Sequence, residues 1–155
     1  SYSTEELREA MIMRFTVVCQ AVSLAAQFAT TEDIVRIKVA NELMIKNIES
    51  DADSVIEQDR EFHALIVKAS GNKVLGKIYS IVSLPTFYTR ESYLLTLKGI
   101  RDTYDSHNRI IEAIEQKAAD YAVELVAGHT PGNRYFQEKF KSEIIEKALS
   151  SQKLC

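Results

Sequence analysis

The sequence has no excess of positive charge. Its 155 residues include 19 lysines and arginines against 22 aspartates and glutamates, a formal net charge of -3 at pH 7, and the isoelectric point is near 5.7. A protein that grips a phosphate backbone needs a basic surface. We therefore do not expect these residues to bind nucleic acid by themselves.

The sequence also lacks the marks of a membrane or secreted protein. No uninterrupted apolar run approaches the ~18 residues of a membrane span, and the first residues do not resemble a signal peptide. The two cysteines, Cys19 and Cys155, form no CxxC pair and no disulfide framework. We expect both cysteines to be free thiols and the protein to be cytoplasmic.

Strand patterns are absent as well. No stretch alternates convincingly between apolar and polar residues, whereas every long segment repeats its apolar residues at the three-to-four spacing of amphipathic helices. The length and the 46% hydrophobic content suit one globular domain with a sizeable core. Gly71 is expected to end the third helix, and Pro85 to break or kink the fourth. We predict an all-α antiparallel bundle of six to seven helices, over about residues 4–28, 31–50, 52–70, 72–84, 100–116 and 119–127, with a short one from 133.

All three histidines fall on the apolar faces of predicted helices. His63 shares its face with an aspartate one turn earlier, Asp59. His107 heads the apolar stripe of the helix over 100–116, and His129 closes that of the helix over 119–127. Each histidine is therefore expected to point inward.

This pattern has two interpretations. A single inward-facing histidine is more often a hydrogen-bonded core residue than a ligand, so a purely structural bundle is one of them. Three such histidines with a buried aspartate favour a metal, because a buried carboxylate needs a positive partner to offset its desolvation. Neutral imidazoles and a carboxylate are normal ligands of zinc, nickel, iron and manganese. The spacing alone leaves both interpretations open.

The same motifs resemble a known family. The run DREFHALIVKASGN, the later run HNRIIEAI and an alanine seven residues before a histidine at a helix end are similar to the FCD domain of the FadR subfamily of GntR-type transcription regulators. An arginine followed ten residues later by LAA, here Arg14 in the first predicted helix, also matches. The resemblance extends from about Arg14 to His129, which is most of the chain.

The resemblance implies an effector-sensing all-α domain that is not an enzyme. It implies that one divalent transition metal is held by four residues, with zinc or nickel favoured over iron or manganese. Arg14 would help to hold a small carboxylate effector, although its spacing alone suggests a helix residue that snorkels to the surface. The metal ligands that match the family are Asp59, His63, His107 and His129, which indicates its metal-binding branch.

The resemblance also implies partners. Residues 1–155 are expected to form one FCD-like ligand-binding and dimerisation domain, and its homodimer would use surplus apolar residues such as Met13, Val17 and Phe28 or those of the fourth helix. A winged helix-turn-helix precedes this domain in the family, and nothing in the sequence resembles one. We therefore expect DNA binding only through a missing N-terminal domain, and no membrane partner.

Three further residues are weaker candidates for effector contacts. Asn72 either reaches the metal site or caps the fourth helix. Tyr88 and Arg90 follow Pro85 in a stretch that either lines the pocket mouth or lies exposed. One departure concerns the Gly-Asp that the family favours between the fifth and sixth helices, because Lys117-Ala118 stands there and the bend is expected to differ.

The alternative function is a metal-dependent hydrolase on a helical bundle. A mononuclear hydrolase needs a general base beside an open metal position. Glu61 neighbours the ligands in sequence but points about 160° away from His63 around the helix. The paired ExxH motifs of a di-iron bundle are absent. We therefore expect sensing rather than catalysis.

Overall fold

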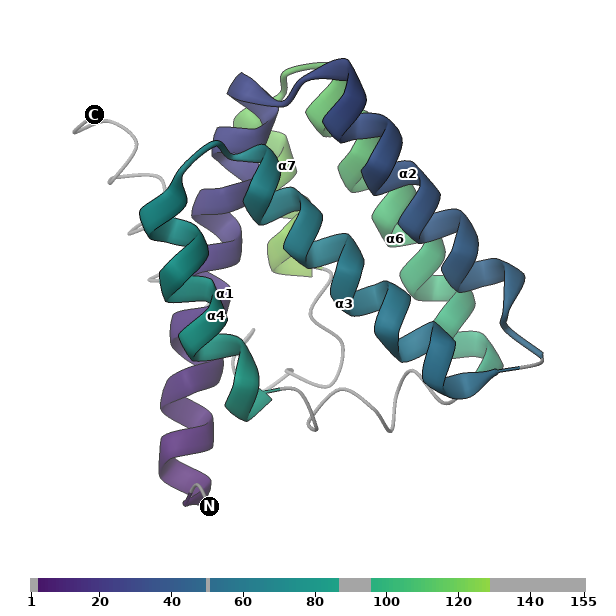
Figure 1. Cartoon of the computed structure of the whole chain (residues 1–155), viewed down its shortest axis with the longest axis horizontal. Helices are drawn as coiled ribbons and strands as arrows, with labels where there is room; N and C mark the ends of the chain where they lie inside the picture. The colour runs from purple at the N-terminus through teal and green to yellow at the C-terminus, as the bar shows by residue number, and fades with distance from the viewer. Residues whose placement is uncertain (1–2, 50, 87–95, 129–155) are drawn as a thin grey trace.

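The computed structural model describes residues 3–49, 51–86 and 96–128, and the regular structure within these ranges is entirely α-helical (Figure 1). The predicted all-α class is thus confirmed. The short helix predicted from residue 133 lies outside the described residues. The helices are α1 (Thr4–Phe28), α2 (Thr31–Lys46), α3 (Ala52–Ala69), α4 (Lys73–Thr86), α6 (Leu97–Glu115) and α7 (Ala119–Gly128).

The first two helices begin with capping boxes. The backbone N–H of Glu6 donates to Ser3 Oγ at 3.1 Å, and the Ser3 N–H donates back to the Glu6 carboxylate at 2.7 Å. Thr30 and Asp33 form the same reciprocal pair at the start of α2, at 3.1 and 2.9 Å. Each box satisfies backbone donors that have no partner within the helix. The starts of α1 and α2 therefore fall where the sequence predicted them.

The turn between α3 and α4 depends on Gly71 and Asn72. Gly71 has a φ of 71°, in the left-handed region where a glycine bears no Cβ clash, and α3 ends there as predicted. Asn72 Oδ1 accepts from the backbone N–H of Leu75 at 2.9 Å and so caps α4. Pro85 does not break α4, which includes it and reaches Thr86.

The connection from α6 to α7 is a Schellman motif with an unusual residue. Thr96 caps α6, which begins at Leu97, three residues before the predicted start at about residue 100. At the other end, the Ala118 N–H donates to the Ala113 carbonyl at 2.9 Å and the Lys117 N–H to the Ile114 carbonyl at 3.1 Å. Lys117 has a φ of 56°, a conformation that favours glycine. The turn therefore keeps a glycine-type geometry despite the lysine.

α1 is the long N-terminal helix and lies beside α4 (Figure 1). It packs against α3, α4, α6 and α7, and its apolar side chains join theirs in the main core. The segment Glu9–Phe28 would also suit a membrane span by length and composition, and 44% of it is buried inside the bundle. Packing on several sides explains why this helix is apolar nearly all round. Cys19 lies in the core as a free thiol, and burial raises its pKa to about 12.

α2 packs against α3 and α6. A second, smaller apolar cluster of Met44, Val55 and Ile100 joins these three helices. Leu43 on α2 is 37% exposed, whereas Asn41, two residues earlier, is fully buried. The inner face of α2 therefore carries a polar side chain into the bundle.

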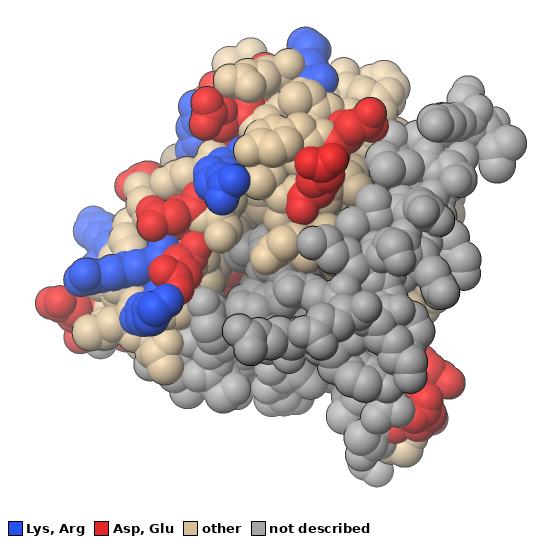
Figure 2. Space-filling model, turned by 180° about the vertical axis from the view of Figure 1, so that it is seen from behind, with Lys and Arg blue, Asp and Glu red and all other residues tan. Residues whose placement is uncertain are grey.

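Charged side chains of both signs are interspersed on the surface. On the face shown in Figure 2, lysines and arginines lie beside aspartates and glutamates rather than gathering into a basic patch. Lys38 on α2 pairs with Glu115 on α6 at 2.8 Å, and Lys98 pairs with Asp102 at 2.6 Å. The described part of this face therefore agrees with the charge balance of the sequence.

Candidate metal centre

The middle of α3 presents a carboxylate and an imidazole to the interior. Asp59 and His63 lie one turn apart and are 3% and 4% exposed. Asp51 fixes the start of the helix, where its side chain accepts from the Ser54 N–H at 3.1 Å. Glu61 between the two buried residues is exposed. The burial of Asp59 and His63 is therefore a property of one face of an amphipathic helix.

α6 brings a second imidazole to the same place. His107 is fully buried, on a face that also carries Thr103 and Ile110. Its ring stacks on Phe62 of α3, with centroids 3.6 Å apart and planes 8° from parallel. The His63 ring lies edge-on to the His107 ring, with centroids 5.3 Å apart and planes 79° from parallel. Phe62 therefore fixes the plane of His107 beside the Asp59–His63 pair.

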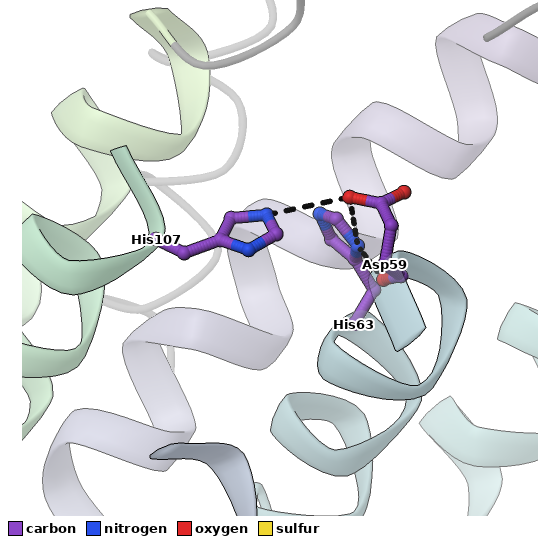
Figure 3. Close-up of side chains that lie close together, drawn as sticks. All are labelled: Asp59, His63 and His107. Atoms are coloured by element: carbon purple, nitrogen blue, oxygen red, sulfur yellow. Dashed lines mark hydrogen bonds and ion pairs between the residues drawn. The ribbon is translucent and has the colours of Figure 1, made fainter. Parts of the chain in front are cut away.

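Asp59, His63 and His107 converge on one point (Figure 3). His107 Nε2 lies 3.4 Å from Asp59 Oδ1, and His63 Nδ1 lies 3.9 Å from the same oxygen. One possible ligand atom from each residue lies within 4.8 Å of those of the other two. Two ligands on a metal with bonds of about 2.0–2.2 Å stand roughly 3–3.5 Å apart. The separation of Asp59 and His107 matches this spacing.

Both histidines use one ring nitrogen in a hydrogen bond to the protein. His63 Nδ1 lies 2.8 Å from the backbone carbonyl oxygen of Asp59. His107 Nδ1 lies 2.9 Å from Asn41 Oδ1. Because these oxygens only accept, Nδ1 carries the proton in each ring. In a neutral ring Nε2 then holds the lone pair, the form in which histidine binds a metal.

These hydrogen bonds favour a positive charge, from a proton or a metal ion, between Asp59 and His107. A neutral His107 with its proton on Nδ1 turns the Nε2 lone pair toward the Asp59 carboxylate at 3.4 Å, and two acceptors at that distance repel each other. A proton on Nε2 or a metal cation removes the repulsion. One carboxylate and two imidazoles form a donor set of borderline transition metals. The residues present therefore fit a metal ion.

The other predicted site residues are less closely tied to this cluster. Arg14 is partly buried on α1, and its guanidinium carbon lies 5.9 Å from the centre of the Tyr79 ring on α4, within cation–π range. Asn72 is exposed and caps α4, one of the two roles predicted for it. Their effector contacts stay predictions, and His129, Tyr88 and Arg90 lie outside the described residues.

Two polar residues near the cluster were missed from the sequence. Asn41 is fully buried and binds His107. Thr103 is 2% exposed, one turn before His107, and its hydroxyl has no hydrogen-bond partner among the described residues. Both interrupt apolar stripes at helical spacing, and that interruption was the available signal. Such an interruption does not show which residue of another helix the polar side chain contacts.

Comparison with known proteins gives one family match and several matching folds. The model of the FCD domain matches residues 9–130, and ten solved chains match in structure. E. coli McbR/YncC is 17% identical with a TM-score of 0.74, over 90% of this chain and 71% of that one. A GntR-family transcriptional regulator from Pseudomonas syringae pv. tomato str. DC3000 is 19% identical with a TM-score of 0.58, over 99% of this chain and 61% of that one. No curated protein matches.

Proposed function

The chain belongs to the FCD domain family, and we propose that it senses a small carboxylate through one divalent transition metal, as the regulatory domain of a GntR-type transcription regulator. An effector-binding, regulatory and non-enzymatic role accords with the family and with the GntR-family structural neighbour. The convergence of Asp59, His63 and His107 from α3 and α6 is the observation that supports a metal-dependent function.

Asp59, His63 and His107 would hold the metal, with His129 as the fourth ligand that the family resemblance implies. Imidazole nitrogens outnumber carboxylate oxygens in this set, which favours zinc or nickel over iron or manganese. When bound, the ion supplies open coordination positions for an oxygen of the effector. The protein supplies the remaining contacts.

The charge of the site favours an anionic effector. Asp59 is the single charged group among the proposed ligands, so a divalent ion there leaves a net charge of about +1. Thr103 adds a buried hydroxyl on the His107 face of α6 that is available to donate to an effector oxygen. Arg14 offers a planar guanidinium for a second acidic group. Together these groups suit a small mono- or dicarboxylate.

Small carboxylates should stabilise the metal-loaded protein against heat. Ligand at a hundredfold excess over its dissociation constant contributes roughly 2.7 kcal/mol, which raises Tm by about 5–10 °C for a chain of this size. The measurement is thermal unfolding with a panel of acids from acetate to glutarate, with and without a chelator. Chelation should abolish most of the rise.

Two variants refine this experiment. Arg14→Ala and Thr103→Val should each reduce the rise in Tm while the metal content stays at the unaltered value, because neither residue is a ligand. A panel in which no acid changes Tm in the loaded protein would contradict carboxylate sensing. Loss of metal from Arg14→Ala would contradict its assignment as an effector contact.

A homodimer through α1 and α4 is the second part of the proposal. These helices pack side by side and carry large exposed apolar side chains: Met13 at 49%, Val74 at 65%, Ile78 at 40% and Ile81 at 72%. Such surfaces on neighbouring helices mark association sites. Val17, which the sequence suggested for this surface, is buried in the core instead.

Sedimentation at tens of micromolar should therefore give a dimer, and Ile81→Asp should convert it to a monomer by placing a charge in the interface. Val39→Asp is the matched control, since Val39 is a 51% exposed apolar residue on α2. A monomer in the unaltered protein would refute the dimer. Dissociation by Val39→Asp alone would move the interface to α2.

DNA binding is assigned to a domain outside this chain. The chain spans 71% and 61% of the lengths of its two structural neighbours, so each neighbour has an additional part. Charges on the face in Figure 2 are mixed rather than basic. We propose that an N-terminal winged helix-turn-helix binds DNA in the cytoplasm and that dimerisation pairs two such domains.

The metal-dependent hydrolase finds no support. Glu61, the carboxylate nearest to the ligands in sequence, is exposed on the opposite side of α3, so it cannot serve as a general base at the centre. The FCD family consists of regulatory domains. Carboxylates incubated with the loaded protein are therefore expected to be recovered unchanged.

A further inference from the structure

Asn41 of α2 is a buried amide whose orientation is fixed by its partners. It is 0% exposed, and a buried amide is costly unless it is hydrogen-bonded. Its Nδ2 donates to the Tyr104 backbone carbonyl at 3.2 Å and to Asn108 Oδ1 at 3.0 Å. A backbone carbonyl only accepts, so the amide nitrogen must face Tyr104. The amide oxygen then faces His107 Nδ1 at 2.9 Å.

This orientation decides which nitrogen of His107 faces Asp59 and the proposed metal site. Asn41 Oδ1 can only accept, so it holds the His107 proton on Nδ1. Nε2 is left to face Asp59 Oδ1 at 3.4 Å. Stacking on Phe62 fixes the ring plane but not the ring's rotation within that plane. The hydrogen bond that His107 Nδ1 donates to Asn41 Oδ1 supplies this missing constraint.

We propose that Asn41 is the positioning residue of the metal centre. Its amide oxygen sets the tautomer and the rotation of the His107 ring so that Nε2 points toward the proposed metal position. The inference rests on the proposed metal site. Metal-bound histidines commonly direct their second nitrogen to an orienting acceptor, and loss of that acceptor typically costs roughly 10–100-fold in metal affinity.

The choice of an amide also bears on the effector. A carboxylate at position 41 would orient His107 equally well but would add a second negative charge beside the metal. The neutral amide leaves Asp59 as the single charged group of the set, which keeps a divalent centre at a net charge of about +1. Asn41 therefore favours an anionic effector as well as the metal.

The test compares Asn41→Leu, Asn41→Asp and Asn108→Ala with the unaltered protein, using zinc affinity from chelator competition. Asn41→Leu should bind zinc roughly 10–100-fold more weakly because it has no acceptor. Asn41→Asp should retain zinc but lose most of the rise in Tm that carboxylates cause. Asn108→Ala leaves the Asn41 oxygen in place and should change neither the zinc affinity nor the rise in Tm. Equal zinc affinity in folded Asn41→Leu, or an equal loss in Asn108→Ala, would overturn the proposal.

Imidazole ¹⁵N spectra of the chelator-treated protein separate this inference from the metal site itself. The unaltered protein should show a slowly exchanging proton on His107 Nδ1, and Asn41→Leu should lose it. If the Nδ1 proton depends on Asn41 in this way but the protein binds no metal, the proposed metal-dependent function is wrong, whereas the role of Asn41 in positioning His107 stands. Metal binding without an Asn41-dependent Nδ1 proton would remove the positioning role alone.

Discussion

His107→Ala should purify with much less divalent metal than we expect for the unaltered protein. His107 is fully buried, and its Nε2 lies 3.4 Å from Asp59 Oδ1. It is the ligand that α6 would contribute to the proposed centre. Its loss removes a metal bond, so affinity should fall by more than the roughly 10–100-fold that an outer partner costs. The measurement is elemental analysis together with chelator competition.

Arg109→Ala is the matched control, because Arg109 is exposed two residues further along the same helix. It should keep the full metal content. Circular dichroism must show that His107→Ala remains helical, so that loss of metal is not loss of fold. A folded His107→Ala protein with unchanged affinity would show that the metal, if present, binds elsewhere.

Phe62→Ala should strongly lower the free energy of unfolding. Phe62 is 0% exposed, belongs to the main core and stacks on His107 at 3.6 Å. Truncating a buried phenylalanine costs about 3–5 kcal/mol because apolar burial is lost and a cavity remains. Urea unfolding of the metal-free protein measures this term without a contribution from the ion.

Leu97→Ala provides the comparison, since Leu97 is 52% exposed and should change stability by no more than about 0.5 kcal/mol. If Phe62→Ala does not fold, Phe62→Leu should fold with a smaller loss and with weaker zinc binding, because the stacking on His107 is gone. Equal stability in Phe62→Ala and Leu97→Ala would contradict the core position of Phe62.

The helices could be predicted closely because their signals are local. Capping residues such as Ser3 and Thr30 and the left-handed Gly71 act within a few residues of the chain. The exceptions are also local in cause. Thr96 starts α6 earlier than the apolar stripe suggests, and Pro85 is accommodated inside α4.

The site could be predicted only in part. Asp59 and His63 lie on one helix, so their spacing placed them on one face. The approach of His107 to this pair depends on how α3 and α6 pack. Residue spacing does not specify that packing, so His107 was assigned to the site from the family resemblance. Asn41 lies 66 residues from His107 in the chain. No helical period connects residues so far apart, which is why this contact was missed.

The most direct test of the proposed metal centre is the metal content of the unaltered protein, purified without chelator, without added metal and without a metal-affinity resin. Inductively coupled plasma mass spectrometry should find close to one divalent transition metal per chain, because Asp59, His63 and His107 form a buried donor set on one point. A content near zero, in protein that also fails to take up zinc or nickel on addition, would contradict the metal centre.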